Sequence, residues 1–308
     1  MNLLFFGSSA FSVPALVGLR SYITCVVTKK TKPKGRGYLL EDNEVKRTAL
    51  SLGLPVREIS SFKDEEAAGL GEPSPDLLVV VSFGLIIPRW FLDLAPMGAV
   101  NVHPSLLPKY RGPSPMQWAI WNGDDVTGIT VIRLSERMDA GNILYQERAP
   151  LAPDEDASTL SSRLGSRVAE VLPPLVEDAA VRGIGQGTPQ NDREATYTPI
   201  ITKEMGRIDW NMSAAEIVRQ VRALVLWPTA YAFLDRKTIK VFKAGPPRAA
   251  SPEKLEPGRV LVVSPEGIEV SAGAGSVVLR EIQMENRKRM AAVDFAKGFR
   301  RLSASVFT

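Results

Sequence analysis

The chain has 308 residues, more than one domain usually holds, so we expect two domains. With one cysteine and one histidine, it can form neither an internal disulfide nor a zinc site with four Cys or His ligands. Residues 201–308 hold 18 of the 38 Lys and Arg and 11 of the 34 Asp and Glu, so they carry a net charge of +7 and residues 1–200 carry −3. This charge distribution favours an enzyme body followed by a basic, partner-binding module, although chance also produces such an excess.

The apolar N-terminus predicts a strand over residues 2–6 that turns into a helix over residues 11–20. A secretory signal peptide is disfavoured, because no Lys or Arg precedes the apolar stretch. The longest apolar run, residues 77–88, is too short to cross a bilayer as a helix. We therefore expect a soluble, cytoplasmic protein that does not associate with a membrane.

Strands and helices then alternate through the first half of the chain. The pattern predicts a β-branched strand, a helix that ends at a glycine and a short strand, over residues 22–28, 43–53 and 54–59. Two continuous apolar runs, residues 76–82 and 98–103, are typical of strands buried on both faces. This alternation predicts an α/β fold with a doubly wound, Rossmann-like parallel sheet.

The second half of the chain has a different pattern. A long helix is predicted over residues 156–182, where Pro173 and Pro174 favour a kink. A stretch rich in Gly, Pro and polar residues follows, then a helix over residues 214–224 and short strands separated by turns, which predict a small OB-like β-barrel. We therefore expect a catalytic domain, a linker and a C-terminal barrel, over residues 1–189, 190–206 and 207–308.

The end of the strand at residues 98–103 carries polar residues suited to chemistry. Asn101 and His103, the only histidine, are two residues apart, so both side chains lie on one face of the strand. Ligands bind beyond the carboxyl ends of such strands, where an amide and an imidazole can polarise a carbonyl and move a proton. An isolated Asn-x-His pair is also compatible with a capping Asn and a surface His. The Pro-rich loop that follows, residues 104–112, favours the chemical interpretation.

Asp139 supplies a carboxylate partner for this pair. It follows the predicted strand at residues 128–134 and precedes Gly141, so it can reach a pocket at the edge of the sheet. A carboxylate near an imidazole orients the ring and stabilises its charged form. Asp-x-Gly alone is more often a turn, but the histidine segment and this segment together form a specific pattern.

At these residues the chain resembles the formyltransferase family that uses 10-formyltetrahydrofolate. The resemblance lies in Asn101-Val102-His103-Pro104-Ser105-Leu106-Leu107-Pro108, Tyr110-Arg111-Gly112, Thr127-Gly128 and Asp139-x-Gly141. Four further motifs resemble the tRNA-acting members in order and spacing: KPKGRG at 32–37, VVSFGLIIP at 80–88, GRIDW at 206–210 and RALVLWPTAY at 222–231. The resemblance covers nearly the whole chain. It implies transfer of a formyl group from 10-formyltetrahydrofolate to the α-amine of initiator methionyl-tRNA, without a metal.

The resemblance also implies roles for individual residues. The catalytic asparagine, histidine and aspartate of the family correspond to Asn101, His103 and Asp139. The residues that contact the folate donor correspond to Ser105, Leu106, Leu107, Pro108, Phe83, Gly84 and Leu85. The basic loop that touches tRNA corresponds to Lys32, Lys34 and Arg36, but Tyr38 and Leu39 stand where the family usually has two lysines.

Other functions remain compatible with the residues themselves. A formyltransferase that acts on an amino-sugar nucleotide or another small amine has the same core, as does a formyltetrahydrofolate hydrolase. Neither needs the run of lysines and arginine at residues 29–36 or a basic second domain. A tRNA- or folate-binding module without turnover is disfavoured because Asn101, His103 and Asp139 are all present. The chain has no coiled-coil heptads, so we expect a monomer.

Overall fold

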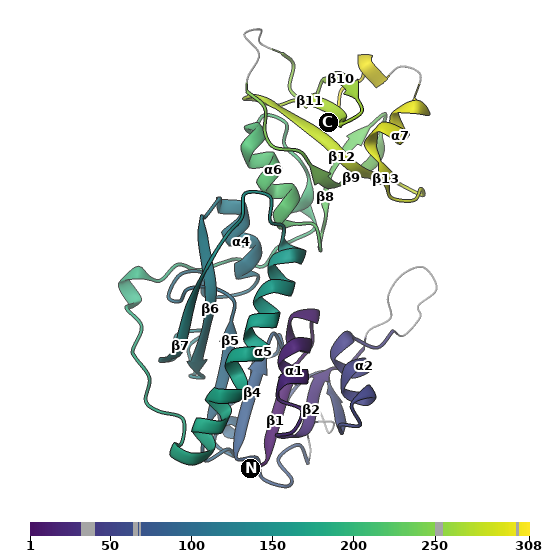
Figure 1. Cartoon of the computed structure of the whole chain (residues 1–308). Helices are drawn as coiled ribbons and strands as arrows, with labels where there is room; N and C mark the ends of the chain where they lie inside the picture. Colours follow the sequence, from purple (N-terminus) through teal and green to yellow (C-terminus); the bar gives the residue numbers. More distant parts are fainter. Residues whose placement is uncertain (32–40, 64–66, 68, 250–254, 300–301) are drawn as a thin grey trace. The chain divides into compact units, whose positions relative to one another are not determined.

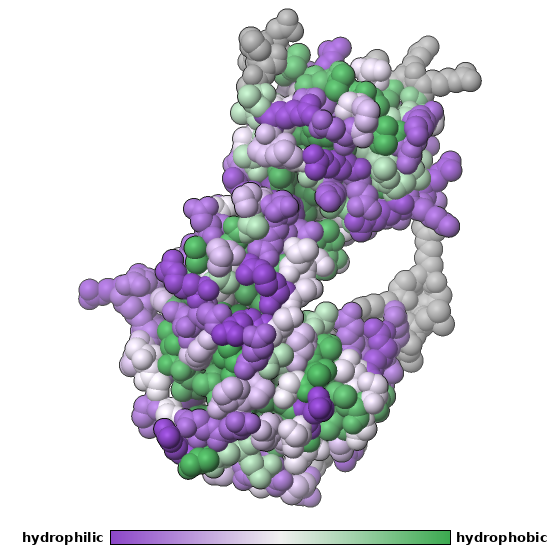
Figure 2. All heavy atoms as spheres, in the orientation of Figure 1, coloured by the Kyte–Doolittle hydropathy of each residue, from purple (hydrophilic) through white to green (hydrophobic). Residues whose placement is uncertain are grey.

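The computed structural model describes residues 1–31, 41–63, 67, 69–249, 255–299 and 302–308. The chain divides into two compact units (Figure 1). The first unit comprises Met1–Gly112, Thr127–Ala149 and Ser161–Tyr197, and the second comprises Pro113–Val126, Pro150–Leu160 and Thr198–Thr308. Within the described ranges, no helix has the length and apolar composition needed to span a bilayer. On the face drawn in Figure 2, hydrophobic residues lie among hydrophilic ones.

The first unit is built on a seven-stranded sheet with the order β3-β2-β1-β4-β5-β6-β7. The strands β1 to β5 are parallel, which confirms the predicted Rossmann-like arrangement. Every residue of β1 and β4 is buried, because strands covered on both faces need apolar side chains at every position. The strands are β1 (Leu3–Gly7), β2 (Ile23–Lys29), β3 (Val56–Ile59), β4 (Leu77–Val81), β5 (Ala99–His103), β6 (Val126–Arg133) and β7 (Ile143–Pro150).

Helices and buried side chains cover both faces of this sheet. Successive side chains of β1 point to opposite faces. Leu4 and Phe6 join a cluster that includes Phe91 of α3, whereas Leu3 and Phe5 are buried on the other face. Figure 1 shows α1 and α5 running along the sheet, and α5 continues as one helix through both of its prolines. The helices are α1 (Val13–Gly18), α2 (Glu44–Ser51), α3 (Arg89–Leu92) and α5 (Ala157–Arg182), with 3-10 turns at Ala10–Ser12 and Asp192–Glu194.

The sheet departs from the parallel pattern after β5, because β6 pairs with β5 in the antiparallel direction. The connection, residues 104–125, returns the chain at the same edge of the sheet instead of crossing over. It contains a helix that the sequence pattern did not predict, α4 (Pro115–Asn122). α4 belongs to the second unit, where Arg219 Nε of α6 donates a hydrogen bond to the Trp121 carbonyl at 3.1 Å.

The second unit contains an antiparallel sheet with the order β10-β11-β12-β9-β8. The C-terminal residues close it into a barrel, because they hydrogen-bond to both edge strands. The Val260 amide donates to the Ser305 carbonyl at 3.0 Å, and Phe233 and Thr308 exchange two hydrogen bonds of 2.7 and 2.9 Å. The small antiparallel barrel predicted from the sequence is therefore confirmed. Its elements are α6 (Ala214–Ala223), β8 (Ala230–Leu234), β9 (Lys237–Ala244), β10 (Val260–Ser264), β11 (Gly267–Ser271), β12 (Ser276–Met284), β13 (Met290–Ala291) and α7 (Ala292–Lys297), with 3-10 turns at Glu204–Gly206 and Leu302–Ala304.

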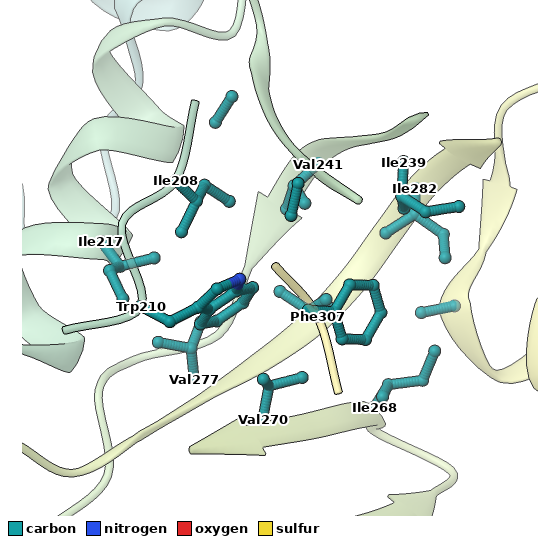
Figure 3. Close-up of a cluster of buried hydrophobic side chains, with 14 of the residues drawn as sticks. Ile208, Trp210, Ile217, Ile239, Val241, Ile268, Val270, Val277, Ile282 and Phe307 are labelled. Atoms are coloured by element: carbon teal, nitrogen blue, oxygen red, sulfur yellow. The ribbon is translucent and has the colours of Figure 1, made fainter. Parts of the chain in front are cut away.

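Two of the buried aromatic rings in the core of the barrel, Trp210 and Phe307, lie next to each other. They are 4% and 1% exposed, and their ring centroids lie 5.8 Å apart. Figure 3 shows them among aliphatic side chains that include Val241 of β9, Val270 of β11 and Ile282 of β12. Because Phe307 lies within the segment that closes the sheet, burial of its ring couples closure to the core.

We expect Phe307→Ala to destabilise the second unit by about 3–5 kcal/mol, the usual cost of truncating a buried ring. Val306→Ala is the matched control, because the neighbouring side chain is only half-buried and its loss should cost about 1 kcal/mol or less. Chemical denaturation followed by tryptophan fluorescence measures both free energies of unfolding. Equal losses in the two variants would contradict the role of the Phe307 ring.

Candidate active site

The candidate site lies at the carboxyl edge of the parallel strands in the first unit. The strand order reverses between β1 and β4, and open α/β sheets bind ligands beside such a reversal. The residues that follow these two strands meet there. The Ser8 amide donates to the Ser82 carbonyl at 3.2 Å, and the Ser9 hydroxyl donates to the Ser82 hydroxyl at 2.9 Å. β5, the next strand, ends at His103 on the same edge.

The structure brings the three predicted catalytic residues together. Asn101 and His103 lie on one face of β5, and Asp139 lies in the turn between β6 and β7. Asp139 Oδ2 is 3.6 Å from His103 Nδ1, and Asp139 Oδ1 accepts a long hydrogen bond of 3.5 Å from Asn101 Nδ2. The imidazole is 6% exposed and the carboxylate 15%, so little water competes for either group.

A backbone carbonyl determines which imidazole nitrogen carries the proton. His103 Nε2 lies 2.8 Å from the carbonyl oxygen of Tyr110, which can only accept a hydrogen bond. The neutral imidazole is therefore protonated at Nε2, and its lone pair is on Nδ1, which faces Asp139. Nδ1 is therefore the ring nitrogen that can accept a proton, and Asp139 Oδ2 lies 3.6 Å from it.

Two unusual backbone conformations support this arrangement. Tyr110 and Asp139 are left-handed, with φ of +64° and +50°, which is costly for residues other than glycine. The Gly112 amide donates to Asp139 Oδ2 at 2.8 Å and so holds the carboxylate toward β5. A side chain at Gly141 would collide with the Arg133 carbonyl, which explains the glycine two residues after the aspartate.

The Ser-Leu-Leu-Pro segment after β5 is held against β6. The Thr130 hydroxyl donates to the Ser105 carbonyl at 2.6 Å and accepts from the Leu107 amide at 3.2 Å. Ser105 and Leu107 are buried, so they shape the loop from inside. Leu106 and Pro108 are half-buried, so part of each side chain stays accessible.

The predicted folate-contacting residues after β4 also divide into buried and accessible positions. The Phe83 ring is 2% exposed and packs edge-on against Phe6, with centroids 5.2 Å apart, so its side chain belongs to the core. Gly84 has a left-handed φ of +73°, and its carbonyl accepts a hydrogen bond from Lys29 Nζ at 3.3 Å. Leu85 is only partly buried.

The sequence patterns gave no indication of a second polar cluster beside the site. Arg111 has no exposed surface, and its Nη2 donates to Gln190 at 2.7 Å and to Asp192 at 2.8 Å. Hydrogen bonds from Arg111 and from the exposed Arg137 hold the pKa of the Asp192 carboxyl below its ordinary value. Gln190 and Asp192 come from the segment predicted as a linker, and a Gly-, Pro- and polar-rich composition carries no signal for such contacts. The predicted tRNA-binding residues Lys32, Lys34 and Arg36 lie outside the described residues.

An amide, an imidazole and a carboxylate gathered at one strand end suit the transfer of an acyl-type group. The family model for formyl transferase matches residues 15–176, and the model for the formyl transferase C-terminal domain matches residues 200–300. The chain therefore belongs to the formyl transferase family.

Several known proteins are similar to the chain. It is 39% identical to the methionyl-tRNA formyltransferase of Syntrophus aciditrophicus (strain SB), over 99% of this chain and 98% of that protein. It is 41% identical to the methionyl-tRNA formyltransferase of Koribacter versatilis (strain Ellin345), over 99% and 97%. Among solved structures, HypX from Aquifex aeolicus in complex with tetrahydrofolic acid has a TM-score of 0.66 at 20% identity, and the match covers 97% of this chain and 47% of that one. At that identity, the likeness to HypX shows a shared fold.

We expect the neutral imidazole of His103 to carry its proton on Nε2, because the Tyr110 carbonyl accepts from that nitrogen. The chain has one histidine, so its imidazole signals need no assignment. A long-range ¹⁵N–¹H correlation spectrum at alkaline pH, where an imidazole is neutral, distinguishes the two tautomers. A spectrum with the proton on Nδ1 would contradict the geometry.

Proposed function

We propose that this chain transfers the formyl group of 10-formyltetrahydrofolate to the α-amino group of initiator methionyl-tRNA. The likeness to proteins named methionyl-tRNA formyltransferase carries the proposal, because it extends along 99% of the chain at 39% and 41% identity and so includes both units. The grouping of Asn101, His103 and Asp139 also supports it, because these side chains can stabilise an oxyanion and move a proton.

In the proposed reaction, the amine nitrogen attacks the formyl carbon and forms the new C–N bond. The formyl oxygen becomes an oxyanion, to which the Asn101 amide donates a hydrogen bond. The present hydrogen bond of this amide to Asp139 is 3.5 Å long, so little is lost when the amide turns to the oxyanion.

The proton of the attacking amine passes to His103 Nδ1, and Asp139 stabilises the imidazolium. A proton then returns to N10 of the folate as the bond between N10 and the formyl carbon breaks. The products are tetrahydrofolate and a formylated aminoacyl-tRNA. Every proton transfer uses a group of this chain, so the proposal requires no metal.

We propose that the donor lies against the loops that follow β4 and β5. Leu106, Pro108 and Leu85 keep accessible side-chain surface there, which suits the apolar faces of a pterin ring. Gly84 adds a position with no side chain to obstruct a ring. The buried members of the set act by shaping the loops or through their backbone; they are Ser105, Leu107 and Phe83.

The tRNA would be held by the basic parts of the chain. Residues 201–308 carry a net charge of +7, and Lys32, Lys34 and Arg36 form part of a basic run without acidic residues. Lys and Arg contacts to phosphates give affinity without reading sequence. We propose that the predicted domain at residues 207–308 and this run bind the tRNA. We also propose that the protein acts as a monomer in the cytoplasm, where tRNA is charged.

The proposal is tested by offering 10-formyltetrahydrofolate with either methionyl-tRNA or an amino-sugar nucleotide. We expect formylation of methionyl-tRNA only, and His103→Ala should lower its rate by about 10²–10⁴-fold, the usual loss when a positioned acid–base group is removed. Thermal unfolding of the variant shows whether the fold is intact. Formylation of the sugar nucleotide and not of the tRNA would overturn the proposed acceptor.

The proposed binding of tRNA by the basic run is tested with Arg36→Ala. Each phosphate contact contributes nearly one unit to the slope of log affinity against log salt, so the variant should show a slope shallower by about one unit and an unchanged affinity for the donor. Arg182→Ala is the control, since that exposed arginine already pairs with Asp178. Identical slopes for the wild type and both variants would contradict a role for Arg36.

A further inference from the structure

We infer that Gln190 is a positioning residue for the catalytic carboxylate, and that it acts by holding the turn that carries Asp139. This inference rests on the proposed function. Gln190 Nε2 donates hydrogen bonds to two backbone carbonyls, those of Asp139 at 2.8 Å and of Gly141 at 2.7 Å. It thereby clamps the turn on both sides of the residue whose left-handed conformation aims the carboxylate at His103.

Arg111 determines which way the Gln190 amide points. Gln190 Oε1 accepts from Arg111 Nε at 3.1 Å and from Nη2 at 2.7 Å. A guanidinium only donates hydrogen bonds and a carbonyl only accepts them, so no other orientation of the amide satisfies both groups. The NH₂ group of Gln190 is therefore directed at the Asp139 turn.

Asp192 and Tyr197 complete the support of Arg111. The guanidinium donates to Asp192 Oδ1 at 2.8 Å and to the Tyr197 hydroxyl at 3.2 Å. Because Arg111 is fully buried, a shift of this cluster would leave a charge with poorer partners, which is costly. The position of Gln190 is therefore set by a group that resists movement.

The same segment also holds the other partner of His103. Thr196 Oγ1 accepts from the Tyr110 amide at 2.8 Å, and the Thr196 carbonyl accepts from the Arg111 amide at 2.8 Å. Tyr110 in turn presents its carbonyl to His103 Nε2. Residues 190–197 thus hold both groups that face the ring nitrogens of His103, the Tyr110 carbonyl and the Asp139 carboxylate. This gives the segment a catalytic consequence beyond its contribution to stability.

Gln190→Glu removes the donors to the Asp139 turn and keeps the acceptor for Arg111. The carboxylate still accepts from Arg111, so the buried guanidinium keeps its partner, but an ionised carboxylate cannot donate to the two carbonyls of the turn. We expect kcat for formyl transfer to fall by about 10- to 100-fold, because small displacements of catalytic groups have effects of this size. KM for the donor should stay within about twofold, and the variant should still unfold cooperatively, at a temperature lowered by the loss of two hydrogen bonds. Asn191→Ala is the matched control, since its amide faces Glu194 and not the Asp139 turn.

A double-mutant cycle with Asp139→Asn shows whether Gln190 acts through the aspartate. If it does, adding Gln190→Glu to Asp139→Asn should lower kcat by less than about twofold further, because residues that act as one unit are not additive. A wild-type kcat in Gln190→Glu, or the same fold-loss in both backgrounds, would overturn the inference.

The single imidazole provides a readout that does not depend on any acceptor. Gln190→Glu should shift the His103 NMR signals of the free protein, and Asn191→Ala should leave them in place. If the wild type does not formylate methionyl-tRNA, the proposed function fails, but this spectrum still tests the positioning. Unchanged signals in Gln190→Glu would show that Gln190 does not hold the Asp139–His103 pair.

Discussion

The hydrogen bond between His103 Nε2 and the Tyr110 carbonyl is the contact that orients the imidazole of the candidate site. It fixes the tautomer and leaves Nδ1 as the nitrogen that faces Asp139. The bond requires Tyr110 in a left-handed conformation, which Thr196, 86 residues later in the chain, supports by accepting from the Tyr110 amide. The orientation of the only imidazole is thus set by backbone geometry and by a threonine far along the chain, and it leaves Nδ1 3.6 Å from Asp139 Oδ2.

The elements that the sequence predicted well are those whose environment is uniform along their length. The runs that became β1 and β4 are apolar throughout, because these strands are covered on both faces. α4 was missed because apolar residues surround it instead of following one face, and its partner Arg219 on α6 lies 98 residues away from Trp121. β7 was also not predicted. It lies at the edge of the sheet and buries none of its residues fully, so apolar and polar residues do not alternate clearly along it.

In the site, too, residues on one strand or on neighbouring strands were predictable, and residues joined by distant contacts were not. Asn101 and His103 could be placed together because they share one strand, and Asp139 because it follows a neighbouring strand of the same sheet. Gln190 could not be placed, since its hydrogen bonds to the Asp139 turn and to Arg111 join residues 51 and 79 positions apart. A glutamine in a Gly- and Pro-rich stretch has the same local pattern whether its amide is solvated or hydrogen-bonded to a distant turn.

The burial of Arg111 is explained better by the hydrogen bonds that it directs than by a contribution to folding stability. Removing a guanidinium from water is expensive, and a buried ion pair contributes on balance little more than an apolar replacement would. Arg111 nevertheless has no exposed surface, and Asp192, its carboxylate partner, is half-exposed. An apolar side chain could not supply the two donors that converge on Gln190 Oε1 and orient its amide. It would therefore not direct the two hydrogen bonds that hold the Asp139 turn. The planar guanidinium of Arg111 thus links residues 190–197 to the Asp139 turn, and this link fixes the direction of the Asp139 carboxylate.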